Sequence, residues 1–128
     1  MTNVRDIANW FLSHDSMTHK KVQKLCYYAQ AWYCALYDGS PLFSDEIQAW
    51  VHGPVIPSIY PVYAGYKWST NPKADFDASA LDEKLTDVLD AVYNTYGELS
   101  GDQLESLTHS EVPWIEARGA LKPWKLST

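Results

Sequence analysis

The chain has 128 residues, of which 46% are hydrophobic and 20% charged, so we expect one folded domain and not a disordered segment. Sixteen acidic residues against ten basic ones give a net charge of −6, which excludes nucleic acid as a main partner, because phosphate binding needs a basic surface. Aromatic residues make up 14%, with six Trp and nine Tyr, and such rings serve either a core or an interface.

No pattern in the sequence points to a membrane. No run approaches the ~20 apolar residues of a membrane span, and Met1–Trp10 lacks the apolar centre of a signal peptide. Cys26 and Cys34 lie about 12 Å apart along one predicted helix, which is too far for a disulfide, since that bond needs Cα atoms within about 7 Å. These features predict a cytoplasmic protein with free thiols.

Two helices are predicted in the N-terminal part of the chain. The first covers residues 3–13, with Asn3 as its N-cap, and the second covers residues 18–38, with Thr18 as its cap and Gly39 at its end. Apolar side chains cover most sides of the second helix, so we expect it at the centre of a helical domain. The basic residues of its first turns are expected to stay solvated: Lys20, Lys21 and Lys24.

The middle of the chain predicts only short elements. Alternating apolar residues within 46–51 indicate a short strand, which the next three residues end. Pro57 suits the first turn of a short helix that reaches Tyr66, although Pro61 interrupts it.

The C-terminal part predicts three more helices. One spans Ser79–Gly97 with its cap at the first residue, and a capping box of Ser100 and Gln103 begins the next. A last helix is expected over 114–118. Together the elements predict a mainly α fold, a compact single-domain helical bundle of residues 1–128 with at most a short β element.

The sequence contains no motif for a cofactor or a metal. It has no CxxC, HExxH, P-loop or GxGxxG pattern, so we expect neither a cofactor nor a metal site. His109 and Glu111 could act as a general acid/base pair in a hydrolase. The alternative, which we favour because no motif places a nucleophile, is that His109 ends a helix and bonds to its last carbonyl groups.

Three other features each allow a structural and a functional interpretation. The turn His52-Gly53-Pro54 is either a tight exit from a strand or a fixed loop that presents Trp50 and His52 to a partner. The adjacent rings of Tyr27-Tyr28 and Trp32-Tyr33 point about 100° apart, so either their helix is enclosed or some rings reach the surface. The third feature is an acidic helix face that is either simply solvated or steers a basic partner: Asp82, Glu83, Asp87 and Asp90.

Four blocks of the sequence resemble one protein family. Residues 22–32, VQKLCYYAQAW, resemble the LQKLLYYAQGW helix of the Panacea domain, the SocA-like antitoxin family, also known as phage-associated GepA-like proteins. The other blocks follow in order: PLF at 41–43 with IQAW at 47–50, VHGPVIPSIY at 51–60, and LTHSEVPW at 107–114 before Ala117 and Arg118. The resemblance covers most of the chain.

The resemblance implies a non-enzymatic, mostly α-helical domain that neutralises an unrelated protein toxin by direct contact. One branch of the family is similar to a proteolytic adaptor that delivers its toxin to ClpXP, and other members are encoded by phages. The alternatives are therefore a phage-encoded inhibitor of a host protein, or such an adaptor. No DNA-binding helix-turn-helix is visible, and against the family pattern the chain departs at Pro61 and is short at its C-terminal end.

The blocks and the turn together suggest which residues contact a partner. We expect no direct contact with nucleic acid and no membrane contact, and the toxin itself is not identified by the sequence. The candidate partner-binding residues are Trp50, His52, Gly53, Pro54, Tyr60, His109 and Trp114.

Overall fold

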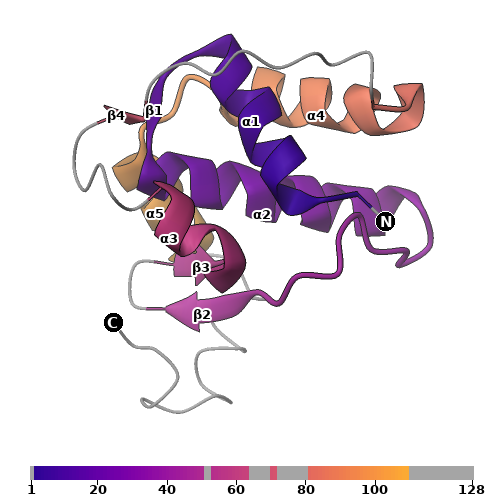
Figure 1. Cartoon of the computed structure of the whole chain (residues 1–128), viewed down its shortest axis with the longest axis horizontal. Helices are drawn as coiled ribbons and strands as arrows, with labels where there is room; N and C mark the ends of the chain where they lie inside the picture. The colour runs from indigo at the N-terminus through magenta and orange to yellow at the C-terminus, as the bar shows by residue number, and fades with distance from the viewer. Residues whose placement is uncertain (1, 51–52, 64–69, 72–80, 110–128) are drawn as a thin grey trace.

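The computed structural model describes residues 2–50, 53–63, 70–71 and 81–109 (Figure 1). Within these residues the elements are α1 (Val4–His14), β1 (Met17–Thr18), α2 (His19–Leu36), β2 (Gln48–Trp50), β3 (Gly53–Val55), the 3-10 helix η1 (Pro57–Ile59), α3 (Tyr60–Tyr63), β4 (Thr70–Asn71), α4 (Glu83–Tyr96) and α5 (Gly101–His109). In the view of Figure 1, α1 and α4 lie above α2 and the β2–β3 sheet lies below it. The predicted mainly α fold is confirmed.

Helix α1 forms as predicted and supplies one side of the core. The side chain of Asn3 accepts a hydrogen bond of 2.9 Å from the backbone N–H of Arg5, which satisfies one of the free N–H groups at the helix start. The face at helical spacing is buried and contains Val4, Ile7, Ala8, Trp10, Phe11 and Leu12.

Helix α2 is the central helix and contacts α1, α4, α5 and β3. Thr18 caps it as predicted, and the chain leaves it through Asp38 and Gly39, both with positive φ. Burial is concentrated between Val22 and Ala29, whereas Leu36 at the other end is 61% exposed. The predicted central position of this helix therefore holds for its first half, whereas its last turn reaches the surface because its neighbours do not cover that end.

The predicted strand near 46–51 is confirmed, and it has a partner that we did not predict. Strand β2 pairs antiparallel with β3, so that Ala49 lies opposite Pro54 and Trp50 opposite Gly53. The chain thus returns antiparallel to β2 as a second strand. Pro54 is tolerated there because the sheet has two strands and each is an edge. A second pairing joins β1 to β4.

The predicted helix start at Ser79 is wrong, because α4 begins at Glu83. Asp82 is the N-cap, and its carboxylate accepts a hydrogen bond of 3.1 Å from the N–H of Leu85. A carboxylate at this position also interacts favourably with the helix dipole. The apolar face of α4 is buried at Leu85, Val88, Leu89 and Val92.

The capping box at the start of α5 is confirmed. The hydroxyl of Ser100 accepts a bond of 3.1 Å from the N–H of Gln103, and the side chain of Gln103 accepts one of 2.8 Å from the N–H of Ser100. The predicted short helix from Pro57 is present as η1 and α3 up to Tyr63. Its continuation to Tyr66 and the predicted helix at 114–118 lie outside the described residues.

Ser100→Ala is expected to lower the free energy of unfolding by about 1 kcal/mol, because the first turn of α5 loses its side-chain acceptor. Urea unfolding followed by circular dichroism measures this change. Ser106→Ala is the matched control, since Ser106 is exposed inside the same helix and alanine has the higher helix propensity. Equal losses in the two variants would contradict the capping role.

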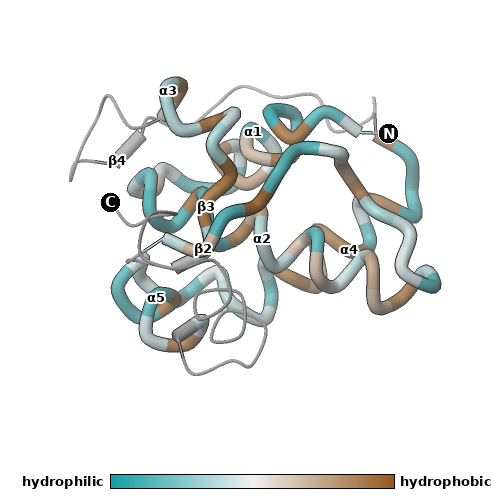
Figure 2. Tube along the Cα trace, turned by 90° about the horizontal axis from the view of Figure 1, so that it is seen from below, coloured by the Kyte–Doolittle hydropathy of each residue, from teal (hydrophilic) through white to brown (hydrophobic). Residues whose placement is uncertain are grey.

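Apolar residues of α1, α2 and α4 form one core cluster, together with Leu104 of α5 and with Leu42, Phe43, Ile56 and Ile59. In Figure 2, brown and teal alternate along the helices, as expected for elements that bury one face. Cys26 is buried and Cys34 half-buried, and both are free thiols, as predicted. No helix within the described part of the chain has the length and apolar character of a membrane span.

Candidate functional site

The first half of α2 carries a cluster of polar side chains that the rest of the fold covers: His19, Lys20, Gln23 and Lys24, called here the Gln23 cluster. Gln23 and Lys24 are each only 1% exposed. The prediction that Lys24 stays solvated is therefore wrong. It is buried because both α5 and β3 pack against this part of α2.

Gln23 binds the backbone of the segment that follows β3. Its side-chain oxygen accepts a hydrogen bond of 2.7 Å from the N–H of Ile56, and its amide nitrogen donates one of 3.2 Å to the C=O of the same residue. The glutamine amide thus pairs with one residue as a neighbouring strand would. Both backbone groups are buried. Without this side chain the N–H of Ile56 would lack a partner, at a cost of about 1–3 kcal/mol, and its C=O would keep only the hydrogen bond of 3.2 Å from the N–H of Ile59.

Gln30 does the same for a second extended segment. Its oxygen accepts hydrogen bonds from the N–H groups of Leu42 (2.7 Å) and Phe43 (3.3 Å), and its nitrogen donates one of 2.8 Å to the C=O of Phe43. Because Gln23 and Gln30 lie seven residues apart, about two helical turns separate them and they share a face of α2. This face holds two loop segments in place.

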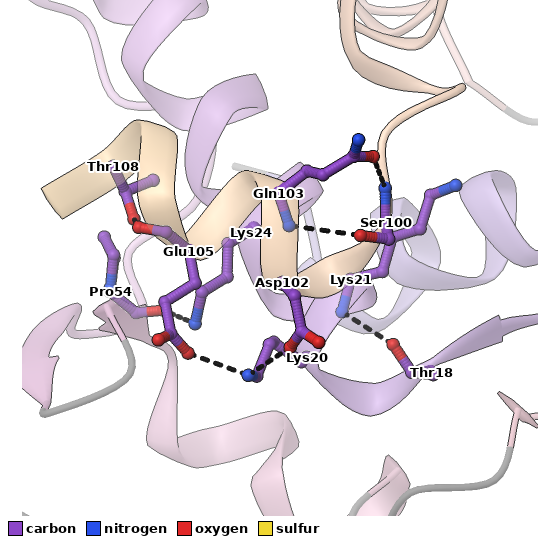
Figure 3. Close-up of polar contacts among 10 residues, drawn as sticks. All are labelled: Thr18, Lys20, Lys21, Lys24, Pro54, Ser100, Asp102, Gln103, Glu105 and Thr108. Carbon is purple, nitrogen blue, oxygen red and sulfur yellow. Dashed lines mark hydrogen bonds and ion pairs between the residues drawn. The ribbon is translucent and has the colours of Figure 1, made fainter. Parts of the chain in front are cut away.

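Lys24 reaches the same region as Gln23. Its Nζ lies 3.4 Å from the C=O of Pro54, a long hydrogen bond (Figure 3). Burial lowers the pKa of Lys24 to about 7, although the negative charge of Glu105 acts in the opposite direction. The ammonium group of Lys24 is therefore easy to deprotonate compared with that of a solvated lysine.

Lys20 joins the cluster to α5. Its Nζ lies 2.8 Å from a carboxylate oxygen of Asp102 and 2.7 Å from one of Glu105, as Figure 3 shows. Burial lowers the pKa of Lys20, but the hydrogen bonds and charges of the two carboxylates outweigh it, so that the pKa is raised. The N-terminal half of α2 is thus bonded to α5 on one side and to the segment around Pro54 on the other.

Aromatic side chains lie at the surface next to the Gln23 cluster. The ring of Trp50 is half-buried and lies 5.1 Å from that of Tyr60, which is 41% exposed and lies 4.7 Å from the ring of His19. Val62, in the same helix as Tyr60, is 39% exposed. We call Trp50, Tyr60 and Val62 the Trp50–Tyr60 surface. Burial, with a smaller contribution from the charge of Lys24, lowers the pKa of His19 to about 4.

The structure brings together some of the residues selected from the sequence. Trp50, Gly53 and Pro54 lie in the β2–β3 sheet, and Tyr60 packs on Trp50, whereas Pro54 itself is buried. His52, Glu111 and Trp114 lie outside the described residues, and His109 is the last residue of α5. Within the described part of the chain, no group of three or more acidic, His or Cys side chains could hold a metal ion.

Sequence analysis missed the roles of Gln23, Lys24 and Gln30. A signal was present, because Gln23 and Gln30 recur at a spacing of two helical turns and interrupt the apolar stripe of α2. A polar residue that repeats inside a buried face needs a hydrogen-bond partner. The partners are backbone groups of loop segments, which a helical pattern does not reveal.

Both interpretations of the adjacent aromatic pairs hold, each for a different part of α2. Tyr28 is buried and stacks on Tyr96 with ring centroids 4.1 Å apart. Trp32 and Tyr33, further along the helix, are only half-buried. The four residues of the acidic face, Asp82, Glu83, Asp87 and Asp90, are exposed as predicted.

The contacts described above connect three of the four sequence blocks. The first block supplies Gln23, Lys24 and Gln30, which bind the backbones of the second block at Leu42 and Phe43 and of the third block at Pro54 and Ile56. These blocks are therefore parts of one local structure.

Comparison with known proteins agrees with this grouping. The family model for the antitoxin SocA-like, Panacea domain matches residues 22–115. No curated protein and no solved structure matches the chain. Because the match covers well over half of the chain, the protein belongs to the antitoxin SocA-like, Panacea domain family.

Proposed function

We propose that the protein is a non-enzymatic antitoxin that neutralises a cognate protein toxin by direct contact through the Trp50–Tyr60 surface. The observation that carries this proposal is a group of large apolar side chains, Tyr60 and Val62 exposed and Trp50 half-buried, on the segment that the Gln23 cluster holds in place. Exposed aromatic residues are typical of binding energy hot spots. His52, Gly53 and Pro54 belong to the same segment, and His109 and Trp114 remain further candidates.

A rigid segment favours binding because little conformational entropy is lost when the partner docks. Two contacts support the Trp50–Tyr60 surface. Gln23 makes buried hydrogen bonds to Ile56, and the Trp50 ring donates a partly buried bond of 2.8 Å from Nε1 to the side chain of Gln48. The polar groups of the cluster are thus engaged in structural contacts, which supports a binding role over catalysis.

The antitoxin role is tested by expressing the neighbouring gene alone and together with this protein in the same host cytoplasm. We expect growth arrest with the neighbouring gene alone, normal growth with both, and a complex that co-purifies. A harmless neighbouring gene that forms no complex would contradict the proposal. Growth rescue that depends on ClpXP, with a longer toxin half-life when the protease is deleted, would identify a proteolytic adaptor.

Tyr60→Ala and Trp50→Ala are each expected to weaken toxin affinity about tenfold or more, because each removes a large ring from the centre of the contact. Isothermal titration calorimetry measures the affinity, and circular dichroism reports folding. Val62→Asp tests the same surface without removing a ring.

Asn94→Ala is the control, since Asn94 is exposed on α4, away from this surface. If the three surface variants bind like the control, the contact lies elsewhere. If Trp50→Ala unfolds while Tyr60→Ala and Val62→Asp bind normally, the rings belong to the core and the proposal fails.

A further inference from the structure

A second exposed apolar site lies at the other end of α2. The last turns of α2 and the facing part of α4 form the two sides of an open groove of about 500 Å³. Its lining is almost entirely apolar: Trp32, Ala35, Leu36, Tyr37, Val88 and Ala91, with Asp87. Leu36 is 61% exposed, more than either Tyr60 or Val62.

The two helices that form the groove run antiparallel. Tyr28 stacks on Tyr96 at one end of the pair, and the Nζ of Lys84 lies 3.8 Å from the centre of the Tyr37 ring at the other. A groove between two packed helices can receive a third helix, whose apolar side chains fill the space between the ridges.

The charges beside the groove are mostly negative. Asp87 lines it, and Glu83 and Asp90 are exposed on the same helix. Among the residues that the structure describes, neither Asp87 nor Asp90 forms an ion pair, because the ion pairs of these residues all join Lys20 to carboxylates of α5. Lys84 is the one basic residue of α4, and it lies over the ring of Tyr37.

We propose that this groove binds an amphipathic helix of a protein partner, with leucine-like side chains against Leu36 and Ala91 and with Lys or Arg side chains against Asp87 and Asp90. The charge complementarity selects a basic helix over an acidic one. This site is separate from the Trp50–Tyr60 surface and does not depend on the antitoxin role.

The test uses two synthetic amphipathic helical peptides with the same leucine face, one carrying lysines and the other glutamates on the polar face. In a titration followed by NMR of the ¹⁵N-labelled protein, the lysine peptide is expected to shift the amide signals of residues 32–37 and 87–91. It is expected to bind about tenfold more tightly than the glutamate peptide, because only the glutamates face like charges.

Leu36→Ser is expected to weaken binding of the lysine peptide about tenfold, and Asp87→Asn to reduce its advantage over the glutamate peptide. Ala31→Ser is the matched control, since Ala31 is exposed on α2 outside the groove. Equal affinities for the two peptides, shifts confined to other residues, or an equal loss in the control would overturn the proposal. So would a dimer in analytical ultracentrifugation that Leu36→Ser dissociates, because a second copy would then be the occupant.

Discussion

Gln23→Ala is expected to lower the free energy of unfolding by about 2–4 kcal/mol, the largest loss that we predict for a single polar residue of this protein. The variant removes the Gln23 oxygen that accepts from the Ile56 N–H at 2.7 Å and the Gln23 nitrogen that donates to the Ile56 C=O at 3.2 Å. The N–H then has no partner, while the C=O keeps the bond from the N–H of Ile59. These groups are buried, so water cannot replace the lost bonds. Urea unfolding followed by far-UV circular dichroism measures the change.

Gln30→Ala is the matched control, because Gln30 makes the same kind of two-sided contact with Leu42 and Phe43 on the same helix. Its contacts are only partly buried, so water can replace some of them and we expect a loss of about 1 kcal/mol. Similar losses for the two variants would show that burial of the Ile56 contact is not what matters. A loss below about 1 kcal/mol for Gln23→Ala would contradict the role given to this side chain.

Gln23→Ala also connects the stability of the fold with partner binding. Ile56 lies between β3 and η1, and the chain runs on directly to Tyr60. Without Gln23, the backbone that carries the Trp50–Tyr60 surface loses its main attachment to α2. We therefore expect weaker partner binding under conditions where Gln23→Ala is still folded, because a looser segment loses more conformational entropy when it docks.

The parts of the fold that depend on neighbouring residues could be predicted from the sequence. The caps at Asn3 and Thr18 and the capping box of Ser100 and Gln103 act within one helical turn, and all three are present. The start of α4 was misplaced because two acceptable caps, Ser79 and Asp82, stand three residues apart. Local preference alone does not decide between such positions.

The parts that depend on distant residues could not be predicted. Lys24 looks like a solvated lysine in its own helix, and it is buried only because β3 and α5 lie against it. Those contacts join residues that are 30 or more positions apart in the sequence, for example Lys24 with Pro54. Leu36 shows the opposite case, since it continues the apolar stripe of α2 and yet is 61% exposed, past the helices and strands that cover the first half of α2.

The Trp50–Tyr60 surface lies between these two cases. The sequence blocks identify Trp50, Pro54 and Tyr60 as a group because they are close along the chain. They do not reveal that Tyr60 is exposed and Pro54 buried, because this depends on how α3 and the β2–β3 sheet pack against the rest of the fold. Predicting the residues of this site is therefore easier than predicting which of them a partner can touch.

The stability of the protein is expected to rise between pH 7 and about pH 8.5, and Lys24→Met to remove most of this rise. The pKa of Lys24 is about 7 in the folded protein and 10.5 when unperturbed. Between these values the unfolded chain binds a proton that the folded chain has released, so the free energy of unfolding increases with pH by up to about 1.4 kcal/mol per pH unit. Urea unfolding at several pH values measures the slope.

The upper limit of this window follows from Cys26, because burial raises the pKa of its thiol. Above about pH 9 the unfolded chain loses this proton while the folded chain keeps it, so the free energy of unfolding falls with pH. His19 contributes below the window, since its pKa of about 4 makes stability rise between pH 4 and pH 6.5. Lys84→Met is the control: it removes an exposed lysine from α4 while Lys24 is retained, so the wild-type slope should persist. A slope that survives in Lys24→Met would show that another group titrates.

Lys24→Met also separates the effect of the buried amine on stability from its effect on partner binding. Replacing a buried charge by an apolar side chain of similar length is often neutral or stabilising by about 1–4 kcal/mol, so we expect this variant to be at least as stable as the wild type at pH 6. Its toxin affinity should nevertheless fall, because the C=O of Pro54 loses the bond that fixes β3 next to Trp50. If the variant is more stable than the wild type and binds the toxin with the same affinity, Lys24 does not position the Trp50–Tyr60 surface.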